Sequence, residues 1–199
     1  MTDFHIALVP VGKIPGDELK AVASRVAKLW RQPVEVRDSV PVPRASEDAQ
    51  RGQHRAVHLL GLLRTAALQL RPGVLVGSSD PNATLPARPN GLVFVTDVDL
   101  FTAATDGVFA ALNSQHGLAV ISVRRLREAF YRRPADAARQ RSRLTKEVLR
   151  MAARLRGVAE CVDPQCAVSP SKSIPDLDTK NEGFCRACAQ RLFEGKIRV

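Results

Sequence analysis

Residues 149–161 read LRMAARLRGVAEC, and this stretch joins the two structural parts that the sequence predicts. Its apolar residues complete a stripe with steps of four, three and four positions, as expected for one face of a helix. The stripe consists of Leu144, Val148, Met151 and Leu155. Gly157 then marks a turn, and Cys161 is the first of four cysteines. We therefore expect a packed helix to end near Gly157 and a cysteine-rich unit to follow it.

The residues before this stretch alternate between strand-like and helix-like patterns. Strands are expected at 4–11, 33–42, 74–80 and 92–100, and helices at 14–30, 46–70, 124–133 and 134–156. A loop is expected at 81–91, and a hairpin at 108–123 that turns at 113–117. This order is typical of a three-layer α/β domain with a mixed sheet. We interpret 1–199 as a single domain, with an α/β body at 1–157 and a cysteine subdomain at 158–199 that ends in a short helix near 188–193.

The four cysteines form two closely spaced pairs in the tail. The pairs are Cys161 with Cys166 and Cys185 with Cys188; they contain four and two intervening residues, and 18 residues separate them. Such pairs can bring four thiolates to one Zn²⁺, and the binding energy would organise a tail that is too polar to fold alone. The sequence predicts one structural zinc ion. Two disulfides, free core thiols and a redox role for the CRAC motif are the alternatives.

The formal net charge of +10 is concentrated at 124–156, which has 12 Lys and Arg residues and three acids. A candidate basic surface in this segment comprises Arg124, Arg125, Arg132, Arg133, Arg139, Arg141 and Arg143. Such a surface would suit a phosphate backbone or an acidic protein partner. A solvated basic surface without a ligand is the simpler interpretation, because arginine is abundant along the whole chain and only Phe130 and Tyr131 supply rings here.

Neither a secretory signal nor a membrane span is evident in the sequence. The first residues, MTDFHIALVPVGK, lack a basic flank and a small-residue cleavage site. No apolar run approaches the roughly 18 residues that a membrane span needs. We expect a cytoplasmic protein without a membrane partner, and disulfides are disfavoured in that compartment.

The spacing around Gly157 and the cysteines resembles the archaemetzincins, a family of zinc-dependent peptidases. Their hallmark is HExxHxxGxxxC-x4-CxM-x17-CxxC, with a third zinc-binding histidine immediately before the first cysteine. Gly157 and all four cysteines fall into register, although the last loop is one residue shorter. Similar stretches cover most of the chain: PVG at 10–12, RGQ at 51–53, VTDVDL at 95–100 and AVISVRRL at 119–126.

Set against this hallmark, the residues that would perform the chemistry have changed. The first two histidine positions fall on Arg150 and Arg154, the third on Glu160, the glutamate position on Met151 and the methionine position on Val168. A guanidinium has no lone pair to offer a metal, and methionine cannot act as a general base. The resemblance thus implies a pseudopeptidase with one structural zinc ion and no catalytic zinc.

Three further expectations concern this altered site. Glu160 should fold back over Gly157 and pair with Arg150 or Arg154; drift to solvated charges is the alternative. Peptide binding in a residual cleft beside the sheet edge would be the remaining function. The rival functions are an adaptor that binds nucleic acid or an acidic partner through 124–156, and an active zinc peptidase with unorthodox ligands that include Glu160.

Overall fold

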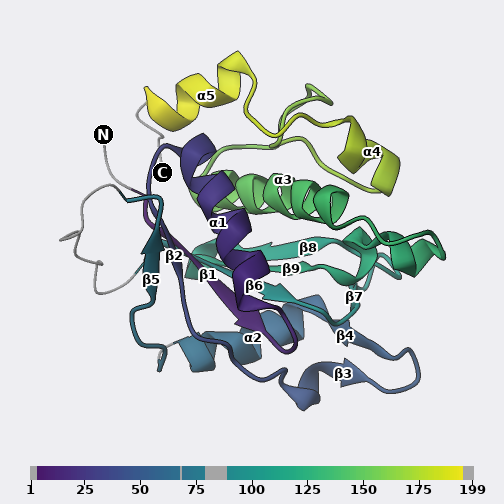
Figure 1. Ribbon diagram of the computed structural model, residues 1–199. Coiled ribbons are helices and arrows are strands. Elements are labelled where there is room, and N and C mark those ends of the chain that lie inside the picture. The colour runs from purple at the N-terminus through teal and green to yellow at the C-terminus, as the bar shows by residue number, and fades with distance from the viewer. Residues whose placement is uncertain (1–3, 68, 79–88, 195–199) are drawn as a thin grey trace.

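The computed structural model describes residues 4–67, 69–78 and 89–194. A six-stranded sheet lies between two helical layers, with helices α1 and α3 on one face and α2 on the other (Figure 1). The strand order is β5 (Val74–Val76), β2 (Val34–Val36), β1 (Ile6–Val11), β6 (Gly91–Thr96), β9 (Leu118–Ser122) and β8 (Ala110–Asn113). The four central strands are parallel, and β5 and β8 are antiparallel to their neighbours. The expected three-layer α/β fold with a mixed sheet is confirmed.

The helices and a small second sheet complete the fold. The helices are α1 (Gly16–Trp30), α2 (Ala56–Ala67), α3 (Ala137–Leu155), α4 (Ile174–Thr179) and α5 (Arg186–Phe193). The second sheet contains β3 (Glu47–Asp48), β4 (Gln53–Arg55) and β7 (Leu100–Phe101). Short 3₁₀ turns are η1 (Arg44–Ser46), η2 (Ser114–His116), η3 (Arg124–Leu126) and η4 (Glu128–Tyr131). Along the described ranges, no helix combines the length and the apolar character that a bilayer span requires.

Helix α3 is the central element of the layer that carries the candidate site. Asp136 caps its start by accepting a hydrogen bond from the Arg139 backbone N–H at 2.9 Å. The expected apolar stripe packs on the sheet: Leu144, Val148 and Met151 are at most 1% exposed. The helix ends at Leu155, and Gly157 follows with φ of 92°. A positive φ suits glycine, so the chain can turn away sharply into the tail.

The tail covers the outer side of α3, on the same face of the sheet as α1 (Figure 1). Apolar side chains of the tail, including Val168, Ile174, Leu177 and Leu192, belong to the same buried cluster as α1, α3 and the sheet. Helix α2 and the opposite face of the sheet form a second cluster. The tail therefore contributes to the main core of the protein.

The helix expected at 46–70 is wrong in its first part, because α2 begins only at Ala56. Ser46 lies in η1, where its hydroxyl donates to the Pro43 carbonyl at 2.8 Å and contacts His54 Nδ1 at 2.8 Å. The chain then turns at Gly52, with φ of 62°, and β3 pairs with β4. These local contacts replace the capping role that we expected for Ser46.

Smaller differences concern segment lengths and the start of the basic region. The strand expected at 33–42 is β2 plus an isolated bridge at Val40. The buried strand expected at 74–80 is the edge strand β5, in which Val74 is exposed. Most of the loop expected at 81–91, with the last residues of that strand, lies outside the described residues. The chain after Arg124 forms 3₁₀ turns before α3 begins, and the sequence did not predict α4.

A buried ionic cluster fixes β2 to the strands and loops beside it. The side chain of Glu35 is fully buried; it accepts hydrogen bonds from Arg37 Nε at 2.7 Å and the Gly73 backbone N–H at 2.7 Å, and it contacts His5 Nε2 at 3.0 Å. Burial alone would raise the pKa of Glu35. The hydrogen bonds from His5, Arg37 and Gly73 outweigh burial and lower it from 4.5 to about 2.

Stability should therefore depend on the ionisation of Glu35 at acid pH. A depressed carboxyl pKa stabilises the fold above pH 4.5, and this contribution, at most about 3 kcal/mol, is lost as the pH falls toward 2. We expect the free energy of unfolding of the wild type to exceed that of E35Q at pH 6. The gap should narrow between about pH 4.5 and 2 in urea titrations. A gap that stays constant with pH would contradict this account.

Candidate functional site

The four cysteine side chains converge where the tail packs on the body. Cys161 and Cys166 follow the turn after α3, Cys185 caps α5, and Cys188 lies in its first turn. Their sulfur atoms all lie within 4.8 Å of one another, and those of Cys161 and Cys185 are 3.7 Å apart. The Cys185 backbone N–H donates to Cys166 Sγ at 3.4 Å. None of the four forms a disulfide.

This donor set fits a tetrahedral zinc ion. Four thiolates are a common closed zinc site, and a backbone N–H that points at a sulfur stabilises its charged form. Burial raises the pKa of the Cys166 and Cys188 thiols. A divalent cation would offset that cost, because it holds each bound sulfur as the thiolate. The spacing-based prediction is thus matched by the geometry.

A buried carboxylate on α3 anchors the middle of the tail. The Glu147 side chain is fully buried; it accepts hydrogen bonds from Arg150 Nη2 at 2.9 Å and Ser171 Oγ at 3.1 Å, and it lies 3.8 Å from Lys180 Nζ. Lys180 Nζ also donates to the Ser169 carbonyl. Burial lowers the pKa of Lys180 to about 8, although Glu147 opposes the shift. No sequence pattern pointed to a role for Ser171 or Lys180.

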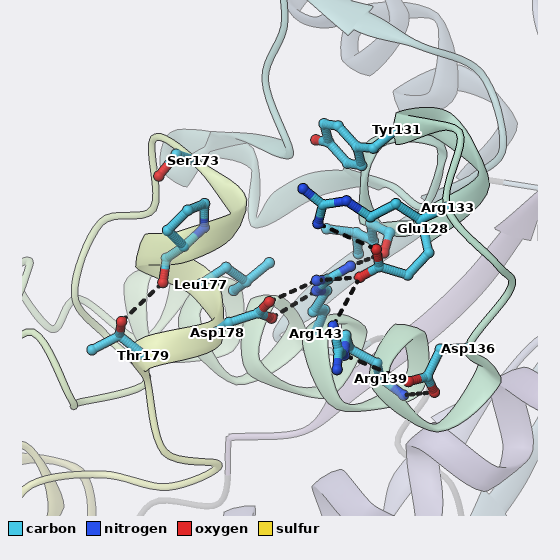
Figure 2. A network of polar contacts seen from close by, with 12 residues as sticks. Glu128, Tyr131, Arg133, Asp136, Arg139, Arg143, Ser173, Leu177, Asp178 and Thr179 are labelled. Carbon is cyan, nitrogen blue, oxygen red and sulfur yellow. Dashed lines mark hydrogen bonds and ion pairs between the residues drawn. The ribbon is translucent and has the colours of Figure 1, made fainter.

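A second network connects α3 to α4 and to the 3₁₀ turn η4 (Figure 2). Arg143 donates to both carboxylate oxygens of Asp178, at 2.7 and 2.6 Å, and to the Leu126 carbonyl at 2.8 Å. Its Nη2 also lies 2.7 Å from Glu128 Oε1. Glu128 in turn contacts Arg133 and Arg139, each at 3.4 Å.

Arg143 therefore does not belong to an exposed basic surface, because its side chain is 1% exposed. Glu128 and Asp178 instead neutralise its charge inside the protein. Of the other predicted surface residues, Arg125 is half-buried and donates to Asp99 at 2.6 and 2.8 Å. The exposed members are Arg124, Arg132, Arg133, Arg139 and Arg141.

The residues at the altered metal-ligand positions are also placed in detail. Arg150 is 8% exposed and directs Nε and Nη2 to Glu147, while its Nη1 lies 3.8 Å from Glu160 Oε1. Arg154 Nη1 donates to the Val158 carbonyl at 2.9 Å, and its buried Nε has no partner among the described residues. Met151 is packed in the core. Glu160 thus pairs with Arg150 as expected, although the contact is long and the Glu160 carboxylate is half-exposed.

A cleft of about 630 Å³ opens beside Arg150. One wall is formed by the loop and strand start at 107–110, next to the edge strand β8, and the other by tail residues 171–175. Arg125 and Tyr131 also line it. Asp99, at the end of the family-like VTDVDL stretch, holds the Arg125 guanidinium in place together with Gln53, which donates to Asp99 at 2.8 Å. The carboxylate therefore supports a cleft wall.

Comparisons with known proteins match this chain to one family of peptidases. Residues 90–194, more than half of the chain, match the model of Peptidase family M54. The archaemetzincin of Pyrococcus furiosus is 27% identical over 95% of this chain and 92% of its own length. That of Thermococcus kodakarensis is 28% identical over 94% of this chain and 95% of its own.

Two solved structures have the same fold. A zinc-dependent peptidase from Methanocorpusculum labreanum superposes with a TM-score of 0.80 and 25% identity, over 94% of this chain and 99% of that chain. The archaemetzincin of Methanopyrus kandleri gives a TM-score of 0.72 at 24% identity over 96% of each chain, which establishes a likeness in fold.

Arg143 and Arg141 offer a matched test of the network in Figure 2. We expect R143Q to lower the free energy of unfolding by about 3 kcal/mol or more, because it leaves Glu128 and Asp178 without their buried partner. R141Q removes an exposed charge from the same helix and should change stability by less than about 0.5 kcal/mol. Chemical denaturation of both variants measures the difference. Equal effects would show that the network contributes nothing specific.

Proposed function

Since the chain belongs to Peptidase family M54, we propose that it is an archaemetzincin-like protein without hydrolytic activity, which holds one structural zinc ion and keeps a cleft for peptides. The observation that carries the proposal is the position of Arg150 and Arg154. In the register of the resemblance, they replace two zinc-binding histidines, and both guanidiniums are engaged by neighbouring groups.

The residues at this position do not fit a catalytic zinc ion. Arginine stays protonated and has no lone pair, so neither Arg150 nor Arg154 can act as a ligand. Their fixed positive charges oppose a cation at close range. Met151 is 1% exposed and has no basic atom that could accept a proton from water. Glu160 alone retains ligand oxygens, and its nearest partner is Arg150.

The four cysteines do fit a zinc ion, and we assign them a structural role. Cys161, Cys166, Cys185 and Cys188 would supply all four ligands, which leaves no open position for a substrate or water. The bound ion would contribute folding energy and would hold α5 against the turn after α3. A site built from reduced thiolates also suits the cytoplasmic location that we propose.

The two rival functions have weaker support. An active peptidase would need a second set of ligands. In the part of the chain that the structure describes, the four cysteines form the one group of three or more metal-binding side chains that lie close enough to share an ion. A nucleic-acid adaptor would need free cations. Arg125, Arg139 and Arg143 are instead held in ion pairs with acids.

Metal analysis and a peptidase assay test the proposal together. We expect the purified protein to carry one zinc ion per chain and to leave labelled casein and peptide libraries intact. C166S and C188S should lose the ion and unfold cooperatively at lower temperature, since zinc binding contributes to folding. Two zinc ions per chain with zinc-dependent cleavage would overturn the proposal.

Restoring the hallmark residues tests whether α3 and the Gly157 turn, the backbone frame of the family's metal site, still place these residues around one ion. We expect the combined variant R150H, M151E, R154H and E160H to bind a second zinc ion, because α3 and the Gly157 turn still set the spacing. The same variant with Arg154 retained serves as the control, and it should hold only the structural ion. A zinc content that stays at one per chain in the full variant would mean that the frame is lost.

A further inference from the structure

The cleft beside Arg150 has an uneven charge distribution. Four cationic side chains line it: Arg125, Arg133, Arg150 and Lys172. Asp178 is the one acid among the described lining residues, and it is bound on both oxygens by Arg143. The lining therefore has a formal charge of +3. A cleft wall with this excess attracts an anionic ligand and raises its local concentration.

The acids that balance these arginines lie outside the cleft. Asp99 binds Arg125, Glu128 contacts Arg133, and Glu147 binds Arg150, yet none of the three acids lines the cavity. Each acid thus restrains its arginine from one side and leaves the other side to the cavity. Binding an anion then costs little side-chain entropy, because the guanidiniums are already ordered.

Two of the cationic side chains are exposed to solvent and can meet a ligand. The Arg133 side chain is 59% exposed, and its contact with Glu128 is long, at 3.4 Å. Lys172 is exposed, and its charge interacts with that of the neighbouring Asp176. Arg150 also lines the cleft, and its Nη1 lies 3.8 Å from the half-exposed Glu160. Of these groups, Arg150 occupies a position where the resemblance puts a zinc-binding histidine.

The remaining lining suits a polypeptide better than a nucleic acid. Val108 and Phe109 on one side, and Ile174 and Pro175 on the other, give the cleft apolar walls. Strand β8 is the terminal strand of its sheet, and an edge strand offers backbone groups to an extended peptide. Stacking of bases would need free rings. Phe109 is only 7% exposed, and the Arg133 guanidinium lies over the Tyr131 ring at 5.7 Å.

We propose that this cleft binds an acidic segment of a partner protein, with carboxylates directed at Arg150, Arg133 and Lys172. The proposal rests on the proposed function, since it takes the cleft of a non-hydrolytic family member and names its ligand class. In this arrangement, the anion-binding Arg150 stands where the family carries a zinc-binding histidine. The site would then select an anionic ligand, whereas a metal site selects a cation.

Fluorescence anisotropy with the zinc-loaded full-length protein tests the assignment. The probes are a short labelled peptide with two adjacent glutamates in an alanine and serine background and its twin with glutamines. At about 0.15 M salt, we expect the glutamate peptide to bind about tenfold more tightly than its twin. R133Q and K172Q should each weaken it about threefold, and R141Q, an equal charge change outside the cleft, should leave it unchanged.

R150Q provides a further variant, with its zinc content as a check on folding. It should abolish the preference for glutamate while one zinc ion remains bound. Equal affinity for both peptides, or equal weakening by R141Q and R133Q, overturns the acidic-ligand assignment. So does a single-stranded oligonucleotide that binds more tightly than the peptide. The proposed lack of hydrolytic activity is tested separately, by the zinc content and the peptidase assay.

Discussion

The buried carboxylate of Glu147 is the interaction on which the arrangement of α3 and the tail depends. A fully buried charge is tolerated only when several partners satisfy it. Here the partners come from both parts: Arg150 from the same helix, and Ser171 and Lys180 from the tail. Removing either part would leave a buried charge without compensation, so helix and tail stabilise one another. The Arg143 network adds a second connection of the same kind.

The sequence predicted those features whose cause is local. The stripe of Leu144, Val148 and Met151 is a repeat along one helix, and the cysteine pairs are short spacings, so both are visible without a fold. The hairpin β8–β9 and its turn were found for the same reason. The helix expected at 46–70 failed because periodicity continued through a segment in which Ser46 contacts His54 and Gly52 permits a turn.

The charged residues show why the rest of the site could not be predicted. Arg143 and Lys180 are residue types that usually lie at a protein surface. Only the fold reveals that each is buried and contacts an acid distant in sequence. The same holds for Asp99 and Arg125, which lie on different elements. Glu160 was an exception: its turn brings it back toward α3 within a few residues, so its pairing with Arg150 followed from the motif spacing.

One wall of the cleft belongs to the tail, and this has a thermodynamic consequence. Residues 171–175 line the cavity, and they lie between the two cysteine pairs. Under the zinc assignment, the bound ion helps to order this wall. Linkage is reciprocal, so a ligand in the cleft and zinc at the cysteines would each tighten the binding of the other. The protein would then couple the supply of zinc to the occupancy of a peptide site, with no catalytic step involved.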